Sequence, residues 1–348
     1  MPMTPMTPDK PQVSIHIVAW NGMTHLQSCL QSIMNQTYQS ISVMVVDNGS
    51  VDGTVPWLAS EYPQVHMLRN TRNLGFCHGH NQAIRITDSP YVLCLNQDIV
   101  LTPDWVTKAV AILQAQPGIG SVGGKLLRYS YSDEELKSVV PSGIIDSAGL
   151  RVYRSRHTVD RGSGEQDSGQ FDRAEPVFGL SGACTLFRRQ ALESIRFRDE
   201  YFDEDFFAYK DDIDIAWRLL RLDWVNWYEG TMVGYHHRSI QGQSKNSNKQ
   251  IVKNFQRRAI FNAAYSYRNH WLLFMKNESS ISLRPDLPWI LWYEFRKIVF
   301  LLATRPAALG GVYRAMRLRS TMKAKAVLLN HVAKQTAGAI RNQWIAQS

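Results

Sequence analysis

Residues 13–22 read VSIHIVAWNG, and the run Val13–Ala19 within them is rich in β-branched residues, which is typical of a β-strand. Apolar residues then recur at helical spacing over positions 26–34. A second apolar run, Val43–Val46, predicts another strand, which ends in Asp47. This strand–helix–strand order predicts a sheet in which neighbouring strands are parallel.

The same alternation continues through the first third of the chain. Further strands are expected at Val65–Leu68 and Tyr91–Leu95, with a helix at Phe76–Thr87 between them. The chain is therefore expected to be an α/β protein with an open, mostly parallel sheet flanked by helices. Ligands of such sheets bind outside the carboxyl ends of the strands, where Asp47 and Asp98 are expected.

Charge is unevenly distributed along the 348 residues. Residues 251–348 hold 16 Lys and Arg against 3 Asp and Glu, a net of +13, whereas residues 1–250 hold 23 against 27, a net of −4. An acidic body with a basic C-terminal end indicates an anionic partner at that end. The apolar fraction of 44% and the charged fraction of 20% exclude bulk disorder and fibrous classes.

Several features exclude common classes of protein. The four cysteines fit neither a C-x-x-C zinc site nor a disulfide framework, so we expect buried free thiols and a reducing compartment. Residues 1–12 are rich in Pro and Thr without an apolar core, which predicts a disordered leader and not a signal peptide. No stretch reaches the ~18 apolar residues that span a bilayer. Gly118–Gly123 matches G-x-G-x-x-G, but it follows an expected helix and enters a strand, the wrong context for a dinucleotide site.

Polar residues concentrate where the expected strands end. Loop Asp47–Thr54 is either an Asx-turn leading into a helix cap or a rim carboxylate that accepts hydrogen bonds from a base or ribose. Asn96-Gln97-Asp98 is either a turn or part of a site for a hard divalent cation. An ion such as Mg²⁺ would be bound there by one or two carboxylates together with substrate phosphates. Between them, segment 69–76 has Asn and Gly that suit tight backbone geometry and two arginines that suit an anion.

Histidines give weaker signals. His78 and His80 read as loop or surface histidines, because H-x-H spacing alone specifies little. His236 follows an apolar stretch, and taken alone it indicates no site. A neutral imidazole at a strand end could nevertheless complete a metal site begun by Asp98.

The densest signal is segment 202–218, where carboxylates alternate with aromatic residues. Six carboxylates lie within twelve residues: Asp203, Glu204, Asp205, Asp211, Asp212 and Asp214. A helix that begins near Asp212 would favour the charged form of a carboxylate at its N-terminus, as a general base requires. The alternative is a capping cluster in which Asp214 and Arg218 form an i,i+4 pair. We favour catalysis, because a solvated face would not need the interleaved aromatic residues.

Taken in order, seven segments resemble the glycosyltransferase family 2 enzymes of GT-A fold, and more closely their bacterial rhamnosyltransferase-like branch. They are Val18–Asn21, Val45–Ser50, Arg72–Phe76, Leu95–Asp98, Leu180–Ala183, Asp211–Asp214 and Tyr235-His236. The resemblance runs from about Val13 to about Asn277 and implies a GT-A-type open mixed, mostly parallel sheet with a helical C-terminal extension. It divides the chain into a leader at 1–12, a nucleotide-sugar transferase domain at 13–250 and a basic helical region at 251–348.

The resemblance also implies a role for each matching residue. Six of them would bind the nucleotide: Ala19, Asn21, Asp47, Asn48, Asn73 and Gly75. Three would contact the donor or acceptor sugar: Ser181, Gly182 and Asp211. Asp98 and His236 would bind a divalent metal, Mg²⁺ or Mn²⁺, with His237 as the alternative to His236. Asp212 is implied as the base that deprotonates the acceptor hydroxyl.

Three departures from the family pattern affect these expectations. The D-x-D metal motif reads Asn96-Gln97-Asp98, so one carboxylate is missing and the metal affinity stays open. His78 and His80 replace the small or amide residues that are usual at their positions. The sequence has no Q-x-x-R-W motif, which predicts single-addition transfer and not processive synthesis.

The C-terminal region reads as helices in which Trp289–Tyr293 and Ile298–Leu302 flank Arg296-Lys297. It is either a helical subdomain with a solvated basic face or a monotopic helix resting on an anionic membrane. The second interpretation suits a lipid-linked acceptor and a cytoplasmic enzyme that is peripheral on the inner face of the cell membrane.

We therefore expect an inverting, non-processive glycosyltransferase of cell-surface polysaccharide synthesis. The favoured donor is dTDP-rhamnose, and the acceptor is a hydroxyl of a glycan or of a lipid-linked saccharide. Two other classes stay open: a catalytically silent sugar-nucleotide-binding protein, and a nucleic-acid-binding protein that uses the basic tail. Nucleic acid is the less expected partner, because it leaves Asp47, Asp98 and the 211–214 carboxylates unexplained.

Overall fold

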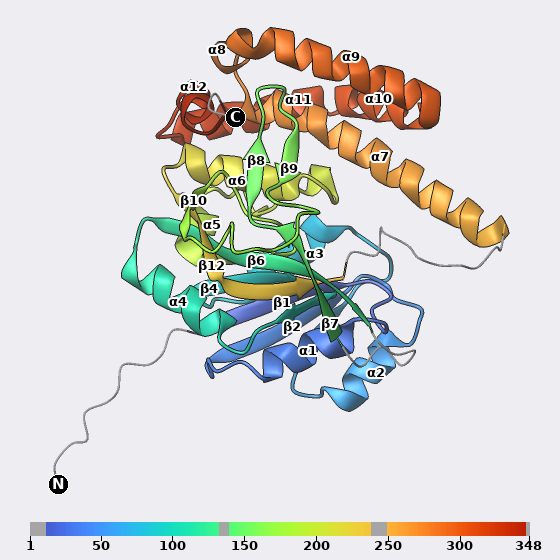
Figure 1. Cartoon of the computed structure of the whole chain (residues 1–348), viewed down its shortest axis with the longest axis vertical. Coiled ribbons are helices and arrows are strands. Elements are labelled where there is room, and N and C mark those ends of the chain that lie inside the picture. The colour runs from blue at the N-terminus through green and yellow to red at the C-terminus, as the bar shows by residue number, and fades with distance from the viewer. Residues whose placement is uncertain (1–11, 132–138, 238–248, 346–348) are drawn as a thin grey trace.

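The computed structural model describes residues 12–131, 139–237 and 249–345, with side chains of the last range described from residue 260. Apart from Gln12, the leader expected at 1–12 lies outside these residues. The sheet and the helices before residue 249 form one body in the lower part of Figure 1, and the C-terminal helices form a slab above it.

A ten-stranded mixed sheet forms the centre of the molecule (Figure 1). Its order is β10-β12-β6-β11-β4-β1-β2-β3, with β5 paired to β12 and β7 paired to β6. The stretch β4-β1-β2-β3 is parallel throughout, and β11 joins it antiparallel to β4. The strands are β1 (Val13–Ala19), β2 (Ile41–Asp47), β3 (His66–Arg69), β4 (Tyr91–Asn96), β5 (Ile99–Leu101), β6 (Ile119–Tyr131), β7 (Val139–Ser147), β10 (Glu175–Val177), β11 (Cys184–Arg188) and β12 (Val225–His236). A separate hairpin pairs β8 (Leu150–Val152) with β9 (Thr158–Asp160).

Helices cover both faces of the sheet. The side chains of β4 alternate accordingly, since Leu93 and Leu95 enter one apolar core while Val92 and Cys94 enter the other. The first core is closed by α1 (Leu26–Met34), α2 (Thr54–Glu61) and α4 (Trp105–Ala115). The second is closed by α3 (Phe76–Ile86), α5 (Arg189–Ser194) and α6 (Asp211–Arg221).

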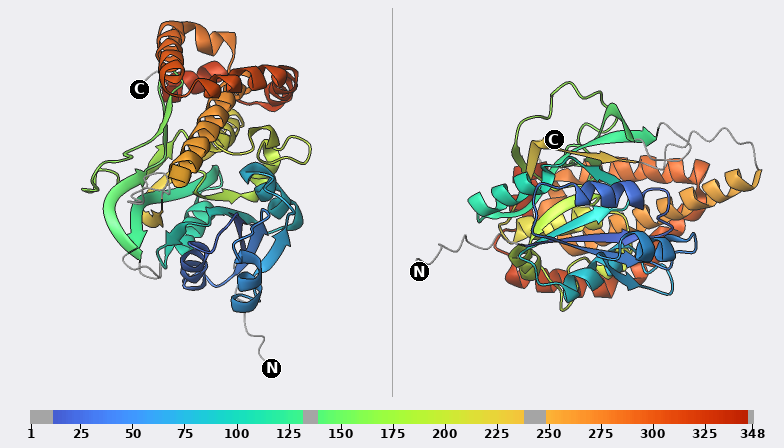
Figure 2. Two further views of the ribbon diagram at one scale, coloured as in Figure 1. Left: turned by 90° about the vertical axis from the view of Figure 1, so that its right-hand side faces the viewer. Right: turned by 90° about the horizontal axis from the view of Figure 1, so that it is seen from below.

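The C-terminal helices extend the second core away from the sheet. Figure 2 shows the long helix α7 rising from the sheet layer to the slab. The helices of this region are α7 (Lys249–Asn277), α8 (Ser280–Leu283), α9 (Leu287–Thr304), α10 (Gly310–Arg317), α11 (Arg319–Val332) and α12 (Ala337–Ile340). A search of the described residues finds no helix with the length and apolar character that a bilayer span requires.

The predicted fold class is confirmed: a mixed sheet flanked by helices, with a helical C-terminal extension. The first four strands and the two helices expected at 26–34 and Phe76–Thr87 lie within two residues of their expected positions. All four cysteines are buried and free. Gly118–Gly123 lies between the end of α4 and the body of β6, so the rejected dinucleotide motif does enter a strand.

Segment 130–175 differs from expectation. We expected a loop or a small excursion without periodicity, but β7, β8, β9 and β10 form there. Three of these strands have only three residues, too few to show an alternating pattern. The proposed division at residue 250 stays a prediction, although α7 begins at Lys249.

Buried ion pairs fasten the C-terminal slab to the sheet body. The ammonium of Lys276 on α7 pairs with Asp203 and lies 2.7 Å from Oδ1 of Asp214 on α6. Asp203 also pairs with Lys325 on α11 at 2.6 Å. The side chains of Lys276, Asp203 and Asp214 are at most 1% exposed, so each charge depends on its partners for compensation.

Lys276→Met is expected to lower the free energy of unfolding by about 3–5 kcal/mol, because it leaves two buried carboxylates without this cation. Urea unfolding followed by circular dichroism measures the change. The control is Lys323→Met on the exposed surface of α11, for which a change within about 0.5 kcal/mol is expected. Equal stability of the two variants would contradict the fastening role of Lys276.

Candidate active site

The candidate site lies at the edge of the sheet where β2, β1 and β4 end and β11 begins. The amide of Trp20, after β1, donates a hydrogen bond to Oε1 of Gln97, after β4 (3.0 Å). The amide of Asn96 donates to the carbonyl of Ala183 (2.8 Å). Because β11 runs antiparallel to β4, Ser181 and Gly182 just before it reach this same edge.

The three predicted carboxylates share this edge. Asp47 is the last residue of β2, Asp98 lies between β4 and β5, and Asp212 lies in the first turn of α6. The amide of Gly182 donates to Oδ2 of Asp212 at 3.3 Å. Any Cβ at position 182 would lie 3.3 Å from the Cβ of Asp212, so a glycine lets α6 approach the strand end closely.

The loops after β1, β2 and β3 are bonded to one another. The carboxylate of Asp47 is fully buried and accepts from the amide of Ser50 (3.2 Å). Oδ1 of Asn21, which has a φ of 51°, accepts from the amide of Val51 (3.0 Å). Asn48 donates from Nδ2 to the carbonyl of Gly75 (3.1 Å). Asp47 therefore makes the expected turn, while its role in reading a nucleobase stays a prediction.

A cavity of about 740 Å³ opens beside these loops. Its polar side is formed by Asn48, Asn73 and the backbone of Gly75, and Oδ1 of Asn73 accepts from the amide of Gly75 (2.8 Å). Its apolar side includes Trp20 and Phe207. Aromatic faces beside amide groups are suited to a base, which is flat and has polar edges, or to a sugar ring, which presents C–H groups and hydroxyls.

Asp98 and His236 meet where β12 ends. Nδ1 of His236 donates to Oδ2 of Asp146 (2.8 Å), and its Nε2 lies 3.5 Å from Oδ1 of Asp98. Burial acts to lower the pKa of His236, but hydrogen bonds with Asp146 and Asp98 raise it to about 9. Burial acts to raise the pKa of Asp98, but the hydrogen bond and charge of His236 lower it overall.

These residues fit a metal that is shared with a substrate. Within the described ranges, no three His, Cys, Asp or Glu side chains are grouped to hold an ion by themselves. Asp98 offers an oxygen donor, and Nε2 of His236 offers a nitrogen donor once a metal displaces its proton. Asp146 fixes the orientation of the imidazole as outer-shell carboxylates do. Two protein donors suffice for an ion such as Mg²⁺ that takes its remaining ligands from phosphates and water.

An aromatic cluster beside Asp98 was not predicted. The rings of His25 and His237 lie 4.6 Å apart, and Nδ1 of His25 lies 3.1 Å from the hydroxyl of Tyr131. Burial and the charge of His237 lower the pKa of His25 to about 4, so it is a neutral group at physiological pH. No local pattern marks this cluster, because its members come from three distant segments.

The acidic segment divides into structural and candidate catalytic groups. Asp203, Asp205 and Asp214 pair with lysines or arginine, and Glu204 pairs with His78 (2.7 Å). The predicted i,i+4 pair forms, with Nε of Arg218 at 2.9 Å from Asp214. The structural alternative therefore accounts for four of the six carboxylates, and Asp211 and Asp212 are left for chemistry.

Asp211 and Asp212 titrate unusually. Burial, followed by the charge of Asp160, raises the pKa of Asp212 to about 6, although the amides of Gly182 and Ile213 oppose the shift. Burial and the charge of Asp212 raise the pKa of Asp211 well above its usual range. A carboxylate with a pKa near 6 is ionised at neutral pH and more basic than an ordinary aspartate, as a general base requires.

Two lysines lie beyond Asp212. Lys210, with a φ of 63°, immediately precedes α6, and Lys297 on α9 has its ammonium 4.6 Å from the ring of Tyr267. Burial and the charge of Lys210 lower the pKa of Lys297 to about 8. Within the part of the chain that the structure describes, neither ammonium has a hydrogen-bond or ion-pair partner. Such a pair is suited to an anionic group of a ligand.

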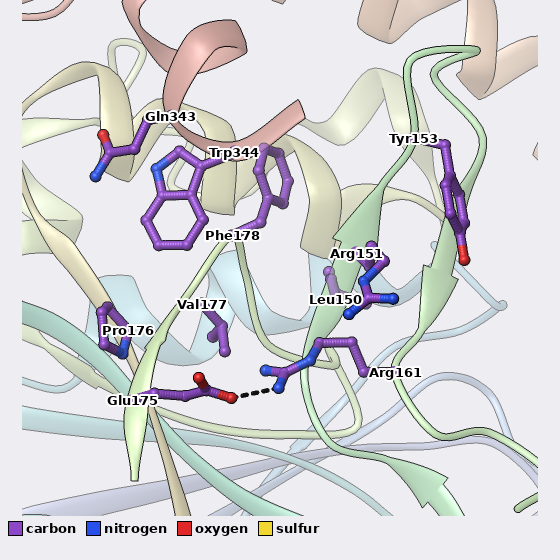
Figure 3. Close-up of a pocket in the computed structure, with 10 residues that line it drawn as sticks. All are labelled: Leu150, Arg151, Tyr153, Arg161, Glu175, Pro176, Val177, Phe178, Gln343 and Trp344. Atoms are coloured by element: carbon purple, nitrogen blue, oxygen red, sulfur yellow. Dashed lines mark hydrogen bonds and ion pairs between the residues drawn. The ribbon is translucent and has the colours of Figure 1, made fainter. Parts of the chain in front are cut away.

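A further cavity of about 490 Å³ lies between β8, β10 and the C-terminal end of the chain (Figure 3). Arg151 and Arg161 point into it from the β8–β9 hairpin, and Trp344 closes the opposite side. A neighbouring hollow of about 500 Å³ shares both arginines and is also lined by Asp160, the residue whose charge acts on Asp212. The second hollow therefore borders a residue whose charge acts on Asp212.

The expectation for the H-x-H pair is wrong for His80. Both histidines lie on α3, not in a loop, and His80 is fully buried with its ring 4.3 Å from that of Phe76. Burial lowers the pKa of His80 to about 3. The H-x-H spacing could not show that His80 is buried, because the helical register of α3 decides which of the two rings faces the core.

Comparison with known proteins gives a family match. The family model described as glycosyl transferase family 2 matches residues 14–196. The N-acetylglucosaminyl-diphospho-decaprenol L-rhamnosyltransferase of Mycobacterium tuberculosis is 26% identical over 238 residues, which cover 64% of this chain and 75% of the relative. An uncharacterized protein of Sinorhizobium fredii is also 26% identical over 238 residues, but the match spans only 25% of its length.

Solved structures share the fold. A mannosyltransferase from Pyrobaculum calidifontis, in complex with GDP-Man and Mn²⁺, superimposes with a TM-score of 0.51 at 19% identity, covering 97% of this chain and 88% of the other. GalNAc-T7 with UDP, GalNAc and Mn²⁺ gives a TM-score of 0.55 at 11% identity, covering 84% and 58%. These likenesses confirm the expected GT-A-type architecture.

Gly75→Ala is expected to close part of the 740 Å³ cavity and to weaken nucleotide binding. Gly75 has a φ of 91°, and a Cβ there would lie 2.6 Å from the ring and carbonyl of Phe207. The thermal shift that UDP- or dTDP-sugars produce should therefore fall or disappear. Gly53→Ala is the control, since Gly53 has the same φ but meets nothing within 4 Å. An undiminished shift in the Gly75 variant would exclude this cavity as the nucleotide site.

Proposed function

The chain belongs to glycosyltransferase family 2 and is a glycosyltransferase, and we propose that it transfers a single rhamnose from dTDP-rhamnose, with inversion, to a saccharide linked to a lipid diphosphate. The observation that carries the proposal is the common sheet edge of Asp47, Asp98 and Asp212, with an aromatic and amide-lined cavity beside it. The M. tuberculosis relative supports the sugar and the acceptor class, because its name describes both.

We assign the donor to the cavity and the adjoining edge. Nucleotide contacts go to the six residues of the β1–β3 loops: Ala19, Asn21, Asp47, Asn48, Asn73 and Gly75. Asp98 and His236 would hold a divalent metal against the diphosphate, and that metal would supply Lewis-acid stabilisation of the leaving group. The Mn²⁺ named with both neighbouring glycosyltransferases supports a divalent ion in general.

The reaction proposed at Asp212 is a direct displacement. The acceptor hydroxyl loses its proton to a carboxylate oxygen of Asp212, and its oxygen forms a bond to the anomeric carbon. The bond from that carbon to the diphosphate oxygen breaks, and the diphosphate leaves with the bonding electrons. One displacement from the face opposite the leaving group inverts the configuration. Ser181, Gly182 and Asp211 border the sugar, because they adjoin Asp212 at the edge.

The surroundings of Asp212 favour an anionic acceptor. Lys210 immediately precedes α6 and Lys297 lies on α9, and neither ammonium has a hydrogen-bond or ion-pair partner among the described residues, so both offer charge to a diphosphate. The arginine-lined hollows near Asp160 offer guanidinium and aromatic groups to the acceptor saccharide. A lipid-linked acceptor would place the enzyme at the inner face of the cell membrane.

Asp212→Asn tests the proposed base. Turnover should fall at least roughly 100-fold, while the thermal shift by donor is retained, because the amide cannot accept the proton.

In the unaltered enzyme, kcat should fall as the pH drops through about 6, where Asp212 becomes protonated. Near-normal turnover in the variant would remove Asp212 from this role. If no nucleotide sugar gives turnover or a thermal shift, the result favours a nucleic-acid-binding protein that uses the basic tail. If nucleotide sugars bind without turnover, the result favours a catalytically silent sugar-nucleotide-binding protein.

Lys297→Met tests the acceptor site. The KM for a lipid-diphosphate acceptor should rise by roughly ten-fold, because a charge-assisted contact to phosphate is lost. The KM for the donor should not change, since Lys297 does not line the nucleotide cavity. Lys323→Met is the matched control. Equal changes in both KM values would contradict a specific contact to the acceptor.

A further inference from the structure

Helix α9 is apolar on nearly every side, but only one narrow stripe of it is covered. Ile290, Glu294 and Leu301 face the protein, and Lys297 is half-buried beside them. The large apolar residues on its other sides are exposed: Leu287, Trp289, Leu291, Trp292, Phe295, Ile298, Val299, Phe300 and Leu302. A helix that is hydrophobic all round is ordinarily buried, so this surface is suited to a partner.

The acids of the C-terminal region all face inward. Glu278 pairs with Arg156, Asp286 pairs with Arg154, Arg156 and Arg341, and Glu294 accepts from Tyr267 (2.8 Å). Their side chains are at most 9% exposed. Between residues 260 and 345, the exposed charged side chains are therefore all cationic: Arg284, Arg296, Arg305, Arg314, Arg317, Arg319, Lys323 and Lys334.

Aromatic and basic residues are mixed on one outer surface. In Figure 1, α9 lies at the top of the slab, and α10 lies below its C-terminal half at the level of α11. On α10, Tyr313 and Met316 are exposed beside Arg314 and Arg317. On α9, the ring of Trp289 carries the guanidinium of Arg154 from the β8–β9 hairpin, 3.5 Å from its centroid. Exposed tryptophans and tyrosines among cations are characteristic of surfaces that enter the headgroup layer of a membrane.

We propose that α9 and α10 form a docking surface for an anionic lipid bilayer. The apolar side chains of α9 enter the headgroup layer, and the surrounding arginines bind lipid phosphates. Charge complementarity favours lipid over a second copy of this chain, because two such surfaces would oppose cation to cation. The inference deepens the proposed function and rests on it only for the acceptor, since Lys297 of α9 lies next to the proposed diphosphate position.

Vesicle sedimentation tests the docking surface without any sugar transfer. The full chain should pellet with phosphatidylcholine vesicles that contain phosphatidylglycerol, and binding should fall with added salt and be weak on pure phosphatidylcholine. Trp292→Glu should weaken binding to the mixed vesicles at least roughly ten-fold. Ile86→Glu on α3 is the matched control, because Ile86 is 57% exposed and Trp292 is 61% exposed. The control should bind as the unaltered chain does.

Three outcomes would overturn the docking surface. They are no pelleting at low salt, pelleting that ignores lipid charge, and equal binding by the Trp292 and Ile86 variants. A dimer in light scattering that Trp292→Glu converts to a monomer would assign α9 to a second copy instead. Thermal melts establish that both variants fold. Vesicle binding without any response to nucleotide sugars would contradict the proposed function and support the docking surface. A response to nucleotide sugars without vesicle binding would support the proposed function and contradict the docking surface.

Discussion

The arrangement of the active-site edge depends on one buried ammonium, that of Lys276. It lies between Asp203, which precedes the loop to α6, and Asp214, which lies one turn into that helix. Both carboxylates would be costly to bury without it, so α7 must stay docked for α6 to keep its place. Because Asp212 belongs to the same helical turn, the position of the proposed base is set by a helix that contributes nothing to the sheet.

The two sides of Asp212 differ in chemistry. Toward β1 and β2 lie amide groups, backbone and aromatic rings, which suit a nucleotide. Toward the β8–β9 hairpin and α9 lie arginines, lysines and further aromatic rings. The proposed base, Asp212, would take a proton from the acceptor and lie close to the anomeric carbon of the donor. It must therefore lie between the acceptor side and the nucleotide side. This arrangement explains why the carboxylate combines burial with contact to Gly182.

Local periodicity made the fold predictable, and long-range pairing limited what could be said about the site. Strands β1, β2 and β4 were readable because each is a compact run of apolar residues with β-branched residues among them. The sequence could not separate Asp211 and Asp212 from Asp203 and Asp214, because the cations that neutralise the latter include Lys276 and Lys325, far along the chain. The His25–Tyr131–His237 cluster was missed for the same reason, whereas the three-residue strands β8, β9 and β10 were too short to show a pattern.

The inward orientation of the three C-terminal acids has a consequence for control. The guanidinium and ammonium groups that remain outside keep their protons throughout the physiological range. The outward electrostatic field of the slab therefore stays positive when the cell acidifies. Its attraction to anions is adjusted mainly by the headgroup composition of the membrane and by the ionic strength of the solution between them.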